Sequence, residues 1–180
     1  MALRDAQRAA ARIIQDAGGE LVGRTRLQKI AFLLELAGFE DEFSFEYRHY
    51  GPYSEDLAQA MEIASILGPV KEDERVADWG GRYSIYTLKE ENVAPADTVR
   101  SNFVQQAKLI DAIELELAAT AAYLFAYEGI GRVAEGNPWH ETRRRKPSKA
   151  DGGRLERAAK AYEELRKIPT IRPLPELPTL

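Results

Sequence analysis

Two neighbouring stretches of the sequence decide the fold: RTRLQKIAFLLEL over residues 24–36 and FEYRHYGPYSEDL over residues 45–57. In the first stretch, apolar residues recur every three or four positions, which predicts a helix with one buried face. Thr25 has a side chain suited to an N-cap, and Gly38 is expected to end the helix. This helix is expected to be largely buried.

The second stretch predicts a strand, a turn and the start of another helix. Aromatic and polar residues alternate over residues 43–50, which is the period of a half-buried strand. Gly51 and Pro52 are expected to end the strand, since Pro has no backbone N–H to continue a ladder. Ser54 is the expected N-cap of a helix that runs to Gly68.

The flanking segments complete a recognisable order of elements. Residues 3–17 have apolar positions at helical spacing, and residues 70–76 and 82–88 predict a β-hairpin. Helix, helix, strand, helix and hairpin is the order of a winged-helix-like module. We therefore predict a winged-helix-like N-terminal half with a small β-sheet over residues 1–90.

The second half of the sequence predicts helices only. Apolar residues at steps of three and four predict one long helix from about Thr98 to Glu128, which needs a partner surface on the first half or on another subunit, as in a homodimer. A closing helix follows, so the fold class is α+β, mostly helical, with a helical half over residues 97–168. We expect a single globular domain over residues 1–168. A proline-rich extended tail, residues 169–180, is expected to contribute little to stability.

Composition excludes several classes of protein. The 180 residues are 44% hydrophobic and 30% charged with a net charge of -4, which excludes a disordered or generally nucleic-acid-coating chain. Cysteine is absent, which excludes disulfides, thiolate zinc sites and cysteine nucleophiles. The two histidines, His49 and His140, have no motif partners, so we expect no enzyme, no metal and no cofactor. We also expect no membrane anchor and a cytoplasmic location.

The motif residues of the two stretches carry a family resemblance. They are Leu27, Gln28, Lys29, Phe32, Tyr50, Gly51, Pro52, Tyr53 and Ser54. Over residues 24–88 the sequence resembles the Panacea family of bacterial antitoxins and its relatives, which include SocA-like proteolytic adaptors and uncharacterised YwgA-like proteins. The resemblance implies a bacterial or phage-associated, toxin–antitoxin type of protein-binding module that sequesters a toxin-like or other protein partner.

Folding requirements explain only part of this motif. Gly51 and Pro52 turn the chain, Ser54 caps a helix, and Gln28 and Lys29 are expected to bond the carbonyls of the turn. Neither the turn nor the helix cap requires the tyrosines of this motif, and tyrosine is enriched at binding hot spots. The predicted partner-binding residues are Tyr47, Tyr50, Gly51, Pro52, Tyr53, Gln28 and Lys29.

A basic run offers a second candidate surface. Its residues, predicted to contact an anion or an acidic partner, are Arg143, Arg144, Arg145, Lys146 and Lys149. Three interpretations stay open: pairing with the acidic first half, an acidic protein partner, or nucleic-acid phosphate. Trp139 beside the run looks exposed, which keeps the nucleic-acid interpretation open.

The order of elements also suggests an alternative function. A winged-helix transcriptional regulator would use the helix after Ser54 to read DNA, but that helix contains Glu55, Asp56 and Glu62 and no Lys or Arg. We therefore expect weak, sequence-independent DNA binding at most. An accessory protein of a mobile-element or phage-defence system is a further alternative.

Overall fold

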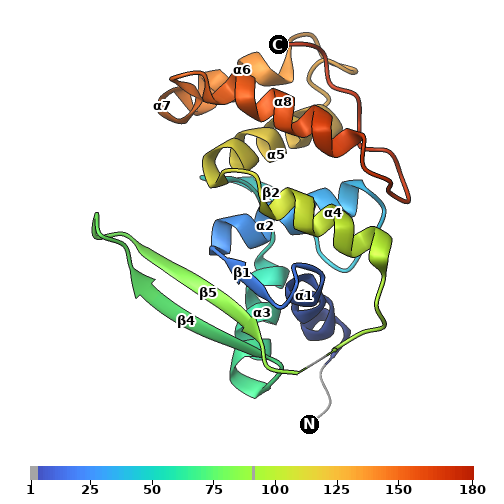
Figure 1. Cartoon of the computed structure of the whole chain (residues 1–180). Coiled ribbons are helices and arrows are strands. Elements are labelled where there is room, and N and C mark those ends of the chain that lie inside the picture. The colour runs from blue at the N-terminus through green and yellow to red at the C-terminus, as the bar shows by residue number, and fades with distance from the viewer. Residues whose placement is uncertain (1–3, 91) are drawn as a thin grey trace.

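The N-terminal half has the winged-helix order of elements (Figure 1). The computed structural model describes residues 4–90 and 92–180. The elements of this half are α1 (Asp5–Asp16), β1 (Glu20–Val22), α2 (Arg24–Leu36), α3 (Glu55–Leu67), β4 (Val70–Val76) and β5 (Arg82–Leu88). Strands β1, β5 and β4 lie in that order in one antiparallel sheet. The predicted α+β class and the predicted hairpin are confirmed, and Leu3, the predicted start of the first helix, lies outside the described residues.

The start of α2 differs from the prediction. Gly23, and not Thr25, precedes the first helical residue, and its φ of 100° is a conformation that favours glycine. The reason is the short strand β1, which leads directly into α2 and which the sequence does not reveal. The Gly23 N–H donates to the Ser84 carbonyl, so the helix start is tied to the sheet.

A two-stranded hairpin lies between α2 and α3. It consists of β2 (Glu46–Arg48) and β3 (Gly51–Tyr53), with Tyr47 opposite Pro52. The predicted strand is therefore shorter than residues 43–50, and Gly51 and Pro52 belong to the returning strand instead of ending the pairing. Only three residues pair on each side, so the lack of an N–H on Pro52 does not prevent the hairpin.

The second half is a stack of helices. They are α4 (Thr98–Lys108), α5 (Ala112–Ala126), α6 (Pro138–Arg145), α7 (Pro147–Ala150) and α8 (Arg154–Arg166). Two helices, α4 and α5, replace the single long helix predicted, because the Asp111 side chain accepts from the N–H groups of Ile113 and Glu114 and starts a new helix. Figure 1 shows α5 between the winged-helix half and the outer helices α6 and α8. Leu117, in the middle of α5, is fully buried.

The proline-rich tail is extended, as predicted, but it packs on the domain. Leu174 and Leu177 are only 3% and 6% exposed. The Tyr162 hydroxyl donates to the Pro175 carbonyl at 2.6 Å, and the Arg172 N–H donates to the Ala37 carbonyl. These contacts contradict the expectation that the tail is a loosely attached segment.

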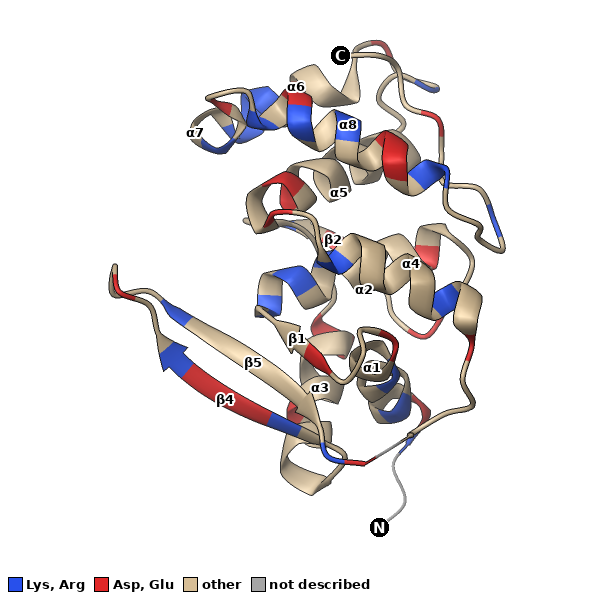
Figure 2. Ribbon diagram, viewed as in Figure 1, with Lys and Arg blue, Asp and Glu red and all other residues tan. Residues whose placement is uncertain are grey.

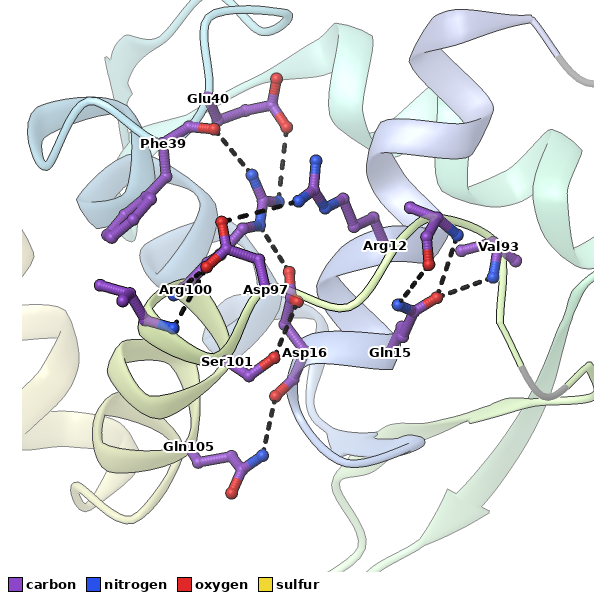
Figure 3. A network of polar contacts seen from close by, with 12 residues as sticks. Arg12, Gln15, Asp16, Phe39, Glu40, Val93, Asp97, Arg100, Ser101 and Gln105 are labelled. Atoms are coloured by element: carbon purple, nitrogen blue, oxygen red, sulfur yellow. Dashed lines mark hydrogen bonds and ion pairs between the residues drawn. The ribbon is translucent and has the colours of Figure 1, made fainter. Parts of the chain in front are cut away.

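A buried polar network ties α1 to α4 (Figure 3). The Arg100 guanidinium forms an ion pair with Asp16, and both side chains are 1% exposed. Arg100 also donates to the Phe39 carbonyl at 2.7 Å, and the Ser101 hydroxyl donates to Asp16. Burial raises the pKa of Asp16, while the hydrogen bond from Arg100 opposes that rise. The network fixes the first helix of the winged-helix half against the helical half.

Candidate binding cleft

An open cleft of about 460 Å³ lies between α2, α3, the β2–β3 hairpin and the three-stranded sheet. Its lining includes four of the predicted partner-binding residues: Gln28, Lys29, Tyr50 and Tyr53. The structure thus brings together, at one cleft, residues from the two stretches that carry the family resemblance.

Gln28 joins α2 to the start of α3. Its side-chain oxygen accepts from the Ser54 N–H at 2.8 Å, and its side-chain nitrogen donates to the Ser54 carbonyl at 2.9 Å. The Ser54 hydroxyl accepts from the Leu57 N–H, which confirms the predicted N-cap. Because all of these groups are buried, each bond also avoids the cost of an unpaired polar group.

Lys29 fixes the returning strand of the hairpin. Its Nζ donates to the Pro52 carbonyl at 2.7 Å, and the residue is only 1% exposed. Burial lowers the pKa of Lys29 to about 7; Glu116 opposes that fall, and Lys146 and Lys149 add to it. The predicted bonds from Gln28 and Lys29 to carbonyls of the turn are therefore confirmed.

Gly51 lies in close contact with α5. Its φ is 86°, and a Cβ at this position would lie 2.4 Å from the Thr120 hydroxyl oxygen. No larger residue fits without displacing the helix or the strand. The hairpin is therefore docked directly on the central helix of the second half.

Two lysines of the basic run hold the other side of the hairpin. Lys146 Nζ donates to the His49 carbonyl at 2.8 Å and to the buried carboxylate of Glu116 at 2.9 Å. Lys149 Nζ donates to both oxygens of Glu116 at 2.8 Å and lies 4.5 Å from the centre of the Tyr50 ring. These two cations support the turn from beneath.

The arginines of the basic run are also paired within the protein. Arg143 pairs with Glu156, Arg144 with Glu141, and Arg145 with Glu128 and Glu141. The predicted pairing with carboxylates therefore occurs, although the partners lie in the second half of the chain and not in the acidic first half.

Trp139 differs from the prediction as well. It is 2% exposed, and its ring packs edge-on against the ring of Tyr162. The sequence suggested exposure because Trp139 stands among polar and charged residues; in fact it lies in the first turn of α6, on the face that meets α8. It is therefore not available to stack on a nucleic-acid base.

The predicted tyrosines differ in accessibility. Tyr50 is 51% exposed at the rim of the cleft, and Tyr53 is half-buried with the Arg48 guanidinium 4.7 Å from its ring centre. Tyr47 does not line the cleft; it packs against Tyr123, with the Arg145 guanidinium over its ring. Pro52 is buried and contributes its carbonyl to Lys29.

The sequence did not indicate the remaining wall of the cleft. Glu72 on β4 and Tyr86 on β5 line it, together with Arg24 at the start of α2. Arg24 donates to Glu72 at 2.6 Å, and the Ser84 hydroxyl donates to the same carboxylate. The contact between Arg24 and Glu72 joins residues 48 positions apart, so no local pattern marks this wall.

Two further findings bear on function. Within residues 4–90 and 92–180, no group of three or more His, Asp or Glu side chains is arranged to hold a metal ion. In the same part of the chain, none of the helices has the length and apolar character that crossing a membrane requires.

Comparison with known proteins gives one informative similarity. No family model matches the chain. The chain is 29% identical over 117 residues to the uncharacterized protein YwgA of Bacillus subtilis (strain 168), an alignment that covers 61% of this chain and 69% of YwgA. This similarity agrees with the resemblance to YwgA-like proteins.

Proposed function

We propose that the protein is a non-enzymatic binding module of the antitoxin or adaptor type, which holds a toxin or another protein partner at the cleft. The observation that carries the proposal is the division of roles around the hairpin. Gln28 and Lys29 fix the backbone at Ser54 and Pro52 through buried bonds, and the Ser54 hydroxyl caps α3, whereas Tyr50 is 51% exposed at the rim. Tyrosine offers a large, rigid contact area at a small entropic cost.

The antitoxin part of the proposal rests on the resemblance to the Panacea family and to SocA-like adaptors. The similarity to YwgA supports a relationship to one branch of that group and assigns no activity, because YwgA is itself uncharacterized. The cleft supports a binding role independently of the family. An accessory role in a mobile-element or phage-defence system would use the same cleft and differ only in the partner.

The winged-helix order of elements favours a DNA-binding regulator as the second candidate. Two observations count against it. Helix α3 contains Glu55, Asp56 and Glu62 and no Lys or Arg, and the cations of residues 143–149 are engaged by carboxylates. A protein that binds DNA must neutralise phosphates, and this helix would repel them.

The test is binding to the product of the neighbouring gene, measured by titration calorimetry and by rescue of growth on co-expression. Tyr50→Ala and Tyr53→Ala should each weaken binding by about 1 kcal/mol or more, roughly fivefold, with little change in stability. Ser54→Ala is the matched control: it should cost about 1 kcal/mol of stability and leave the affinity of the folded protein unchanged.

Two results would count against the proposal. If the tyrosine variants lose stability in proportion to binding, the rings serve folding and not recognition. If the protein instead binds one defined DNA operator tightly at near-physiological salt, the regulator becomes the better interpretation.

A further inference from the structure

A short segment of the tail is held by side chains of the helical half. The segment is Leu-Pro-Glu-Leu-Pro, residues 174–178, together with Thr179. Three side chains, from the start of α6 and from α8, direct N–H or O–H groups at its carbonyls. They are Tyr162, 2.6 Å from the Pro175 oxygen, Asn137, 2.7 Å from the Thr179 oxygen, and Arg166, 3.5 Å from the Leu174 oxygen. We call Asn137, Tyr162 and Arg166 the tail site.

The two leucines of the segment pack in an aromatic-lined part of the core. Leu174 and Leu177 are buried in the same apolar cluster as Trp139 and Tyr162. Residues three positions apart share a face of a polyproline II helix, because this helix has three residues per turn. The Glu176 side chain, between the leucines, is 82% exposed. The site therefore selects for the two leucines and leaves the position before the second leucine free.

Backbone pairing and charge contribute little to how the segment is held. In the described part of the chain, residues 173–180 form no backbone–backbone hydrogen bond. Residues 169–180 contain one cation, Arg172, and one anion, Glu176, so most of this segment is tan in Figure 2. Pro178 packs closely on Gly131, where a Cβ would lie 3.0 Å from the proline ring. Apolar contacts and donors to carbonyls are thus the main attachments.

Proteins recognise proline-rich peptides through the same features. Such peptides bury apolar side chains against aromatic rings, and they lose little entropy on binding because they are already extended. At the tail site these contacts join α6 and α8 to a segment of their own chain. Residues 167–173 form the linker between α8 and this segment. Because each chain already seats its own tail, a second copy offers no additional contact.

We propose that the tail site binds proline-rich peptides with the pattern Leu-Pro-x-Leu-Pro, that residues 174–178 occupy it as a built-in competitor, and that its partner is an extended segment of another protein. The tail site lies on α6 and α8, whereas the cleft lies between α2, α3 and the sheet, so the two sites can be tested separately. A short linker gives the tail an effective concentration on the order of millimolar, so a partner segment displaces it only by binding more tightly or by being concentrated locally.

The test uses the full chain with the double substitution Leu174→Ser and Leu177→Ser, which releases the tail from its site. A fluorescein-labelled peptide with the sequence of residues 172–179 should bind this variant at least about tenfold more tightly than it binds the wild type, because the tail no longer competes. The same peptide with Ser in place of Glu should bind within about twofold of it. A peptide with Ser in place of both Leu should bind at least about tenfold more weakly. Fluorescence polarisation measures all three affinities.

Two tyrosine variants locate the bound peptide. Tyr162→Phe, added to the double variant, removes the donor to the Pro175 carbonyl and keeps the ring, so the affinity should fall about fivefold. Tyr83→Phe is the matched control on β5 and should leave the affinity unchanged. Equal affinities of these two variants would place the peptide elsewhere and overturn the proposal. Circular dichroism checks that each variant is folded at the assay temperature, and Leu177→Ala alone carries the same comparison where the double variant is not.

Three further results would overturn the proposal. If a folded variant binds no peptide, or binds it regardless of its leucines, the tail contacts serve folding and not peptide recognition. If the peptide binds the wild type and the double variant equally well, the tail does not occupy the site that the peptide uses. If size-exclusion chromatography with light scattering detects a wild-type dimer that dissociates in the double variant, the partner is a second copy and not another protein.

Discussion

Raising the pH from about 7 to about 9 is expected to stabilise the protein by about 2 kcal/mol through Lys29 alone. The side chain is 1% exposed, and burial lowers its pKa to about 7 from the ordinary value of 10.5. Between these values the unfolded chain binds a proton that the folded protein does not, so the free energy of unfolding rises with pH. The slope of the free energy of unfolding against pH approaches about 1.4 kcal/mol per pH unit above pH 7. It vanishes well below pH 7, where Lys29 is protonated in both the folded and the unfolded protein.

The matched variant is Lys29→Met, which is similar in length and does not titrate. It removes the donor to the Pro52 carbonyl, but that loss is nearly the same at every pH and cancels from the slope. Glu116, Lys146 and Lys149, the charged groups that face Lys29, are present in both proteins. The difference between the two slopes therefore reports on Lys29.

Urea unfolding at about pH 7, 8 and 9 gives the free energy of unfolding of each protein. The wild type should gain about 2 kcal/mol more than Lys29→Met over this range. Parallel pH profiles would refute the reasoning, because they would mean that Lys29 keeps its proton in the folded protein and that water or a carboxylate solvates it.

Three further predictions concern stability. Removal of residues 169–180 should lower the melting temperature by several degrees in a thermal scan, because it uncovers the apolar surface on which two tail leucines pack; an unchanged melting temperature would contradict that packing. Leu117→Ala should cost about 2 to 5 kcal/mol in denaturant unfolding by leaving a cavity in α5, and a variant as stable as the wild type would place this face at the surface. Asp16→Ala should cost about 3 kcal/mol in the same assay, because it removes the nearer of the two carboxylates that pair with the buried Arg100 and leaves only Glu40, at 3.5 Å; a loss below about 1 kcal/mol would show that Glu40 or water replaces Asp16.

The winged-helix order could be predicted because most of its elements carry a local signal. Apolar spacing marks α2 and α3, and the β4–β5 hairpin is marked by the turn residues 78–81 and the β-rich composition of residues 82–88. Strand β1 could not be predicted, since three residues show no period and Glu20 pairs with Thr87, far along the chain. The break between α4 and α5 has a local signal, the capping residue Asp111, but the apolar spacing continues across it.

The candidate site could be predicted only where the residues in contact belong to the two neighbouring stretches of the motif. The bonds from α2 to the turn join residues 23 to 26 positions apart, within one motif. The wall formed by Glu72 and Tyr86 depends on how the sheet folds over α2, which no local pattern records. The ion pairs of the basic run could not be predicted for the same reason. In the sequence its cations have few nearby carboxylates, but in the structure they pair with Glu116 in α5 and with Glu128 just after α5.

The contacts of Lys146 and Lys149 with the turn of the β2–β3 hairpin bear on when this turn can form during translation. Lys146 bonds the His49 carbonyl across 97 positions of sequence, and Lys149 reaches Glu116 and the Tyr50 ring. A nascent chain that has left the ribosome only as far as α5 contains Tyr50 and Tyr53 but neither of the lysines that hold the turn from beneath. The support beneath the turn is therefore complete only after Lys146 and Lys149 have been translated.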